Sequence, residues 1–251
     1  MPIIKLKNDE QILLIDEANR TVHAVLDYIE EKIQSGMSTC ELNDLAVEKL
    51  QEFKGATAAF KGYRGFPKSI CTSVNGVVVH GIPSEYELRD GDIVGVDFGV
   101  RQNGVVGDAA RTFVIGNISD DIKNLVENTK IALYNGIAEM KDSNRLYDIN
   151  NAIASIAKLN NYGIVKGYCG HGVGEQMHED PHVYNYVESA EPNVRLRAGM
   201  VMALEPMFTL GASDVRVMKD GWSVTTVDGK PSCHWELSIA ITKNGPKILG
   251  K

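Results

Sequence analysis

An internal repeat constrains this chain more than any other feature. Residues 88–97 read LRDGDIVGVD, and residues 196–205, 108 positions later, align on them without gaps as LRAGMVMALE. Each copy ends in a carboxylate, and each follows a His-Gly-apolar triplet, at residues 80–82 and 171–173. A repeat of this kind organises the whole fold, because each copy is expected to form the same local structure. Since each copy supplies one histidine and one acid, the repeat predicts a metal site on a pseudo-twofold axis.

Secondary structure is predicted to repeat in the same order. Apolar residues at three- and four-residue spacing indicate helices at 8–34 and 39–53, and again at 120–140 and 147–159. A β-rich region follows each pair, and in the first half it contains strand candidates at 69–73, 77–80, 93–100 and 105–115. The two halves, about 1–118 and 119–251, meet without a flexible linker. We therefore expect an α+β fold, with a single domain over 1–251 and its site at the seam between the halves.

Composition and charge narrow the class of protein. The chain of 251 residues is 43% hydrophobic and 24% charged, which is typical of a globular protein. Its net charge of -7 argues against nucleic-acid binding, which favours a basic face. The apolar run at residues 12–15 is far too short for a signal peptide or a membrane span. The four cysteines are widely spaced without a C-x-x-C pair, so we expect no disulfide framework and a reducing, cytoplasmic location.

Two aspartates flank a predicted hairpin turn. Asp97 and Asp108 lie on either side of residues 102–104 (QNG), a turn signal between two alternating apolar runs. If the turn centres on residues 102–103, Asp97 faces Asp108; if it centres on 103–104, Asp97 faces Ala110 and Asp108 is its diagonal neighbour. Side chains alternate along a strand, so both registers put the two carboxylates on one face. Like charges at that spacing repel, and a divalent cation between them would remove the repulsion.

Further metal ligands are expected in the second half. His171 and His178 lie in the glycine-rich run 170–178 (GHGVGEQMH), which favours a strand or loop over a helix. Glu205 and Glu236 adjoin apolar strand-like runs, where an acid needs a partner or a metal. His171 and the four carboxylates make a set of five ligands that suits two hard-to-borderline divalent ions. Three other histidines are interpreted as ordinary core or surface residues, namely His23, His182 and His234.

The motifs around these residues match those of a known family. They are Gly62-Tyr63, 65–71 (GFPKSIC), 73–75 (SVN), 80–83 (HGIP), 90–92 (DGD), Val96-Asp97, Gly107-Asp108, 170–174 (GHGVG), 178–181 (HEDP), Gly199-Met200, 205–207 (EPM) and 220–222 (DGW). In these motifs the chain resembles the type I methionine aminopeptidases of the short bacterial form (peptidase family M24A), essentially from end to end. The resemblance implies the pita-bread fold, in which two pseudo-twofold-related halves pack helices on a curved antiparallel sheet.

The resemblance also implies a role for each ligand. Asp97 would chelate one divalent ion, Asp108 and Glu236 would bridge two, and His171 with Glu205 would complete the second site. A water or hydroxide held between the ions would attack the first peptide carbonyl, and Glu205 would carry its proton. We expect the ions to be Co, Mn, Fe or Zn, because ligand type alone does not separate these metals.

Other residues are implied to bind the substrate or a monovalent ion. His178 would stabilise the developing oxyanion, and His80 would contact the scissile amide nitrogen. The methionine side-chain pocket would be formed by Tyr63, Phe66, Cys71, Met177 and Trp222. A separate Na or K site would be formed largely by backbone oxygens of Asn75, Val77 and Ser232.

The implied activity is removal of the initiator methionine from the N-termini of nascent polypeptides, at the ribosome exit among other places, when the second residue is small. We expect a monomer, and the chain's own Met1-Pro2 start fits such a substrate.

Two alternatives remain open. One is an X-Pro peptidase of the same fold, which would carry an additional N-terminal domain. The other is a non-catalytic binding protein of the same fold, which would have lost the ligands.

Three residues depart from the family pattern. Leu237 stands where a histidine usually follows the last acid, so a supporting partner for the metal ligands is missing. Met177 replaces a common aromatic residue, and its flexible thioether can still line a pocket for methionine. Arg64 replaces a common histidine and is expected to alter the access of substrate.

Overall fold

The structure, a computed structural model, describes residues 2–251, so the proposed cleavage after Met1 concerns a residue outside the described part. The helices are α1 (Asp9–Lys32), α2 (Thr39–Leu50), α3 (Asp120–Ala138) and α4 (Leu146–Leu159), with a 3₁₀ turn at Tyr63–Gly65. The strands are β1 (Thr57–Ala58), β2 (Cys71–Val74), β3 (Val77–Val79), β4 (Ile93–Gln102), β5 (Val105–Val114), β6 (Gly163–Ile164), β7 (Gly170–Gly172), β8 (Glu179–Val183), β9 (Val201–Leu204), β10 (Met207–Thr209), β11 (Val215–Val217), β12 (Val224–Thr226), β13 (Ser232–His234), β14 (Leu237–Thr242) and β15 (Gly245–Ile248). The predicted order of two helices followed by strands therefore occurs twice.

Local capping explains where the helices begin. Asn8 caps α1 and Ser38 caps α2, each in a reciprocal capping box with the third helical residue. All four predicted helices are present, with ends that differ by at most three residues from the sequence prediction. The strand predicted at 69–73 instead begins at Cys71, because the Ser69 N–H donates to the Asn43 side chain of α2 (2.9 Å).

Across residues 2–251, every helix is too short or too polar to cross a membrane.

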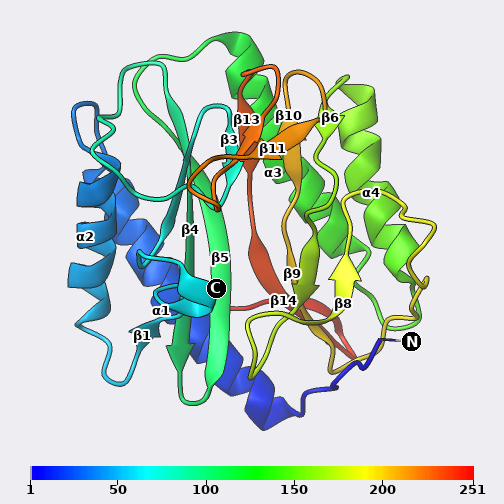
Figure 1. The fold of residues 1–251 in the computed structure, drawn as a ribbon. Coiled ribbons are helices and arrows are strands. Elements are labelled where there is room, and N and C mark those ends of the chain that lie inside the picture. Colours follow the sequence, from blue (N-terminus) through cyan, green and yellow to red (C-terminus); the bar gives the residue numbers. More distant parts are fainter. Residues whose placement is uncertain (1) are drawn as a thin grey trace.

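Helices cover one side of the strands in each half. In the first half, Val96 and Phe98 of β4 pack with Leu26 of α1 in one buried apolar cluster. In the second half, α3 and α4 pack on β9 and β14 in another. Figure 1 shows α1 and α2 beside the long β4–β5 pair, and α3 and α4 beside the strands of the other half. Because side chains alternate along a strand, Asp97, between Val96 and Phe98, faces away from the helices.

The β4–β5 hairpin has its turn at Asn103-Gly104, the second of the two registers considered. Both turn residues have positive φ, 51° and 81°, as a tight hairpin turn with the Asn-Gly sequence requires. Asp97 therefore pairs with Ala110, and Asp108 is its diagonal neighbour on the same face. Local turn chemistry thus sets the relative position of the two aspartates.

The two copies of the repeat have the same backbone structure. Gly91 and Gly199, which align in the repeat, have φ values of 98° and 95°, a region that favours glycine. A turn hydrogen bond precedes each strand at equivalent positions, from Asp92 N to Arg89 O (3.0 Å) and from Met200 N to Arg197 O (3.1 Å). These turns lead into β4 and β9, so the repeat delivers its two acids from equivalent strands.

The halves are joined by backbone hydrogen bonds close to the acids. The first half contains the order β1–β4–β2 with β5 on β4, and the second contains β15–β14–β9–β7–β8. Strand β3 of the first half pairs with β12 of the second. Ala110 and Glu236 exchange two backbone hydrogen bonds, of 3.0 and 3.2 Å. The carboxylates of the two halves therefore meet at the seam.

Candidate metal centre and active site

Four carboxylates and one histidine converge from different strands. Asp97 and Asp108 lie in β4 and β5, Glu205 directly follows β9, and Glu236 directly precedes β14. His171 lies in β7, which pairs with β9. All five side chains line one cavity of about 150 Å³. The structure therefore brings together the whole set of ligands predicted from the sequence.

His171 directs one ring nitrogen at two of the acids. Its Nε2 lies 3.9 Å from Oδ2 of Asp108 and 3.8 Å from Oε1 of Glu205. Its Nδ1 lies 2.9 Å from the carbonyl oxygen of Gly172 and can donate a hydrogen bond to it. That bond leaves the Nε2 lone pair facing the acids, as in a histidine that binds a metal. Single ligand atoms of Asp108, His171 and Glu236 all lie within 4.8 Å of one another.

The carboxylates lack the hydrogen bonds that buried acids need. Within the described residues, Oδ1 of Asp97, Oδ1 of Asp108 and Oε1 of Glu236 have no hydrogen-bond partner. Burial raises the pKa of Asp97 and of Glu205 to about 7. Burial and the neighbouring acids raise the pKa values of Asp108 and Glu236 well above their ordinary range. Because buried acids are normally paired or metal-bound, this oxygen-rich set fits divalent metal ions.

His234 corrects one interpretation made from the sequence. It is buried, and its Nε2 lies 3.5 Å from Oε2 of Glu205 and 4.0 Å from Oε2 of Glu236, with no hydrogen-bond partner among residues 2–251. It is therefore not an ordinary core histidine. Leu237 lies in the apolar core of the second half instead. The signal in the sequence was the two-residue spacing of His234 and Glu236, because residues two apart in an extended chain face the same side.

The other two histidines that were interpreted as ordinary agree with that interpretation. His23 is buried, with one ring nitrogen 3.2 Å from the carbonyl oxygen of Leu249 and the other 3.2 Å from the Arg111 guanidinium. His182 is half-exposed, and its Nδ1 lies 3.5 Å from Oε1 of Glu191. Both therefore have partners outside the cluster of carboxylates.

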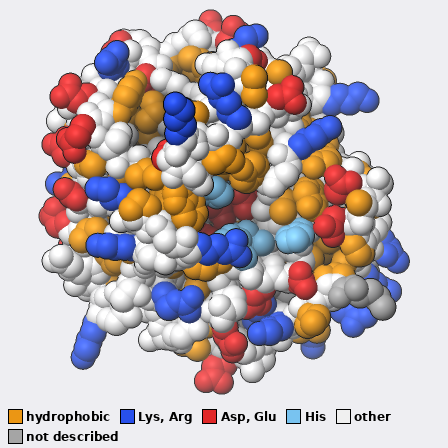
Figure 2. All heavy atoms as spheres, in the orientation of Figure 1, with side chains coloured by type: hydrophobic (Ala, Val, Ile, Leu, Met, Phe, Trp, Pro, Cys, Tyr) orange, Lys and Arg blue, Asp and Glu red, His pale blue; other side chains and the backbone are white. Residues whose placement is uncertain are grey.

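The predicted substrate residues line the same cavity as the acids. They are Tyr63, Phe66, Cys71, His80, Met177, His178 and Trp222. Figure 2 shows a hollow in this face of the molecule, with acidic side chains at its bottom, histidines beside them and hydrophobic side chains around its edge. The cavity therefore combines a charged floor with an apolar wall.

His178 is held by an aromatic neighbour. Its Nδ1 lies 2.9 Å from the Tyr63 hydroxyl, and the two rings are stacked with centroids 5.5 Å apart. Its ring centroid is also 4.4 Å from that of His171. Burial, with a smaller contribution from the Arg64 guanidinium, lowers the pKa of His178 to about 3. His178 is therefore neutral near pH 7, and Nε2 is the ring nitrogen that does not bond to Tyr63.

The apolar wall is well packed. The rings of Phe66 and Trp222 meet edge to face, with centroids 5.2 Å apart. Burial and the nearby acids raise the pKa of the Cys71 thiol, which keeps it neutral. Phe60, which was not predicted from the sequence, also lines the cavity. A Cβ at residue 99 would lie 2.7 Å from the Phe60 ring, so Gly99 makes room for it.

His80 and Arg64 lie where the cavity meets a second, wider cavity of about 510 Å³ that also contains Glu205 and His178. His80 follows β3 with a φ of 58°, and burial lowers its pKa to about 4. The Arg64 guanidinium lies 5.4 Å from the centre of the Tyr63 ring. Both side chains therefore stand at the opening through which a peptide would reach the acids.

The three residues predicted to bind a monovalent ion also lie together. The Ser232 hydroxyl donates to the backbone oxygens of Asn75 (3.0 Å) and Val77 (3.2 Å). The Asn75 side chain is occupied, since it donates to Asp92 (2.7 Å) and accepts from the Ile93 N–H (3.1 Å). The Asn75 carbonyl oxygen also accepts from the Ser232 N–H (2.9 Å), so the backbone oxygens of Asn75 and Val77 and the Ser232 hydroxyl lie close together.

Comparison of the sequence with known proteins decides the family. The model of metallopeptidase family M24 matches residues 14–243. The chain belongs to this family. It is 44% identical to the methionine aminopeptidase of Clostridium perfringens, over 98% of each chain, and 43% identical to methionine aminopeptidase 1 of Bacillus subtilis, over 98% of this chain and 99% of that one.

Solved structures agree with the predicted α+β pita-bread fold. The methionine aminopeptidase of Rickettsia prowazekii superposes with a TM-score of 0.95 at 36% identity, covering 99% of this chain and all of that chain. The prolidase of Pyrococcus furiosus has the same fold, with a TM-score of 0.78 at 22% identity, and 65% of its chain is covered. The X-Pro peptidase alternative is therefore not favoured, and membership of M24 together with the cluster of carboxylates supports divalent metal binding.

Proposed function

We propose that this protein is a metal-dependent methionine aminopeptidase that removes the first methionine from polypeptides whose second residue is small. One observation carries the proposal. All twelve residues expected to bind metal, contact the scissile bond or hold the methionine side chain line a single cavity. Similarity to methionine aminopeptidases over nearly the whole chain supports the same activity.

The cluster of carboxylates would hold two divalent ions. Asp97 is proposed to bind one ion, His171 and Glu205 the other, and Asp108 and Glu236 both; the proximity of Asp108 and Glu236 to each other and to His171, with single ligand atoms all within 4.8 Å, supports this assignment. When bound, such ions act as Lewis acids that polarise a carbonyl and lower the pKa of water. Carboxylate and imidazole ligands are compatible with Co, Mn, Fe or Zn, and His234 beside Glu205 and Glu236 is proposed to support the ligands.

The chain's own groups would handle the proton and the developing charge. Glu205 is proposed to carry the proton, because it lies at the junction of the two cavities, within reach of both water and a peptide. If the Tyr63 hydroxyl donates to Nδ1 of His178, the proton of the neutral ring stays on Nε2. Nε2–H would then donate to the carbonyl oxygen as negative charge develops there. His80, on the same opening, is proposed to contact the amide nitrogen.

The shape of the cavity suits an unbranched thioether. The side chains of Tyr63, Phe66, Cys71, Met177 and Trp222 form a largely apolar wall beside the acids. Selection for a small second residue is proposed from the similarity to methionine aminopeptidases.

Further features of the proposal concern the setting of the enzyme. We propose that residues 1–251 act as one catalytic domain, supported by the ladder between β3 and β12. We also propose a monomeric, cytoplasmic enzyme that acts on nascent chains, including those at the ribosome exit. The four free cysteines support a reducing compartment. The oxygens of Asn75, Val77 and Ser232 are proposed to bind Na or K.

Hydrolysis of Met-Xaa-Ser peptides tests the proposal. The protein is loaded with Co, Mn, Fe or Zn under reducing, anaerobic conditions, and products are measured by mass spectrometry with Xaa from Gly and Ala through Val to Leu and Lys. We expect rapid release of methionine before Gly and Ala and little before Leu or Lys. An X-Pro dipeptide is the control substrate. Efficient cleavage before Leu or Lys, or preference for the X-Pro dipeptide, would refute methionine excision.

A further inference from the structure

The segment before α1 lies against the loop that carries His178. The Lys7 N–H donates to the Gly199 carbonyl oxygen (2.7 Å), and the Ile3 N–H donates to Oδ2 of Asp180 (2.6 Å). Lys7 lines a cavity of about 460 Å³, together with Arg101 of β4 and Gln176 of that loop. The N-terminal segment therefore contacts the active-site loop through residues that do not line the substrate cavity.

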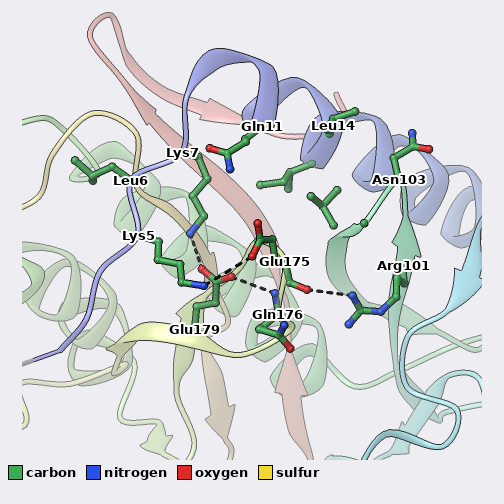
Figure 3. Close-up of a pocket in the computed structure, with 14 residues that line it drawn as sticks. Lys5, Leu6, Lys7, Gln11, Leu14, Arg101, Asn103, Glu175, Gln176 and Glu179 are labelled. Atoms are coloured by element: carbon green, nitrogen blue, oxygen red, sulfur yellow. Dashed lines mark hydrogen bonds and ion pairs between the residues drawn. The ribbon is translucent and has the colours of Figure 1, made fainter.

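A buried ion pair connects the segment to the loop. The Lys7 ammonium lies 2.7 Å from Oε2 of Glu179, and both side chains are only 7% exposed. Figure 3 shows the Lys7 side chain extending from the N-terminal segment to Glu179, whereas Lys5 beside it reaches towards Glu175. The Lys5–Glu175 pair is long, at 3.8 Å, and well exposed. Breaking a buried ion pair destabilises a protein far more than breaking an exposed one, so the Lys7–Glu179 pair constrains both side chains.

Glu179 also contacts other residues of the same loop. The Glu179 backbone pairs with Gly172 at the base of the loop. The Glu179 side chain accepts a hydrogen bond at Oε1 from the Gln176 N–H within the loop (3.1 Å). The Lys7 stem packs so closely that a Cβ at Gly174 would lie 2.7 Å from the Lys7 Cε. Met177 and His178, which face the substrate cavity, lie between these anchored points.

We propose that Lys7 is a positioning residue for the reaction, which acts through Glu179 to set the position of the loop and thereby of His178. This inference rests on the proposed function. Lys7 lies outside the residues that line the substrate cavity, so its effect on turnover passes through the loop. An oxyanion donor is sensitive to its position, and a displacement of about 1 Å can lower the rate about 100-fold.

The primary variant is Lys7→Met, which keeps an unbranched stem and removes the charge. Turnover of Met-Ala-Ser by metal-loaded protein is measured together with metal content. We expect kcat to fall about 10- to 100-fold, with a smaller change in KM and two metals still bound, because the ligands lie on other strands. Lys5→Met is the matched control, since Lys5 neighbours the same cavity but makes only an exposed pair, and its kcat should stay at the wild-type level.

A double-mutant cycle separates positioning from a general loss of structure. If Lys7 acts through His178, Lys7→Met should lower kcat by less than about threefold in a His178→Ala background. A merely structural role would lower turnover by the same factor in both backgrounds, and that additivity would overturn the proposal. Unchanged kcat in Lys7→Met would overturn it as well.

A second variant keeps the test valid if Lys7→Met folds poorly. Lys7→Met/Glu179→Gln removes both charges, and replacing a whole buried pair is far less destabilising than breaking it. The same non-additive loss of kcat with His178→Ala is expected, and retained turnover would overturn the proposal. Wild-type protein is assayed alongside, because absence of methionyl-peptide hydrolysis there refutes the proposed function rather than the role of Lys7.

Discussion

Removing the metal ions should leave a protein that loses stability as the pH rises from 7 to 8. The reason is the cluster formed by Asp97, Asp108, Glu205 and Glu236, whose pKa values are all raised by burial. In the unfolded chain these acids are ionised at pH 7, whereas the folded, metal-free protein retains part of their protons. The folded state therefore binds more protons than the unfolded state, and stability falls as the pH rises through the folded pKa values.

Histidines act in the opposite direction and set the useful pH window. Burial lowers the pKa values of His23 and His80 to about 4 and of His178 to about 3, and it lowers that of His234 as well. Their contribution to stability is present above the ordinary histidine pKa and is lost as the pH falls. Below about pH 6.5 the two effects therefore oppose each other strongly, whereas above pH 7 the carboxylates dominate.

The magnitude follows from these pKa values. Between pH 7 and 8, a group with a folded pKa of about 7, such as Asp97 or Glu205, lowers the free energy of unfolding by about 0.4 kcal/mol. Burial and the neighbouring acids also raise the pKa values of Asp108 and Glu236, so these groups act in the same direction, each by at most about 1.4 kcal/mol per pH unit. The three histidines with pKa values of about 3 or 4 together oppose this by about 0.4 kcal/mol. We expect a net loss of at most about 3 kcal/mol over one pH unit.

Urea unfolding of chelator-treated protein at several pH values between 7 and 8 measures this loss. Added Mn²⁺ or Co²⁺ should reverse the trend, because metal affinity rises as the ligands lose protons. Asp108→Asn should make the metal-free slope shallower, whereas Glu85→Gln, at an exposed acid, should leave it unchanged. A metal-free stability that is flat or rises between pH 7 and 8 would refute the reasoning about the acids.

Three further predictions concern individual residues. Asp108→Ala should abolish hydrolysis while the fold persists on its large core; turnover above a few per cent with two metals bound would contradict the ligand assignment. His178→Ala and His80→Ala should each lower kcat by about 100-fold with little change in KM, in steady-state assays with methionyl peptides, because their contacts strengthen in the transition state. His234→Asn should weaken metal affinity about 10- to 100-fold by calorimetry, whereas Leu237→His, in the apolar core, should not change it.

Much of the fold and of the site could be predicted from the sequence because the signals are local. Helix caps such as Ser38 and the Asn-Gly turn act over a few residues, and the turn limited the position of Asp97 relative to Asp108 to two registers. The repeat added long-range information, since equivalent glycines force equivalent turns before β4 and β9. The motifs shared with the family then identified the residues expected to form the methionine pocket.

What could not be predicted depends on contacts between distant segments. The pairing of β3 with β12 has no sequence signature, because any two β-rich runs can form an antiparallel pair. Phe60 enters the cavity only because Gly99, on another strand, lacks a side chain. The Lys7–Glu179 pair joins residues 172 positions apart. Such contacts follow from the packing of the whole chain rather than from any local pattern.

The repeat also explains why the two halves contribute unequally to the site. His80 and His171 each begin the His-Gly-apolar triplet of their half, yet only His171 lies in a strand that pairs with the acid-bearing strand of its own half, β7 with β9. In the first half β2 occupies that place beside β4, and the chain reaches His80 only after the β2–β3 turn, in a left-handed conformation. His171 therefore points at the carboxylates, whereas His80 stands at the opening of the cavity. One duplicated unit can thus supply a metal ligand from one copy and a group for contacting the peptide from the other.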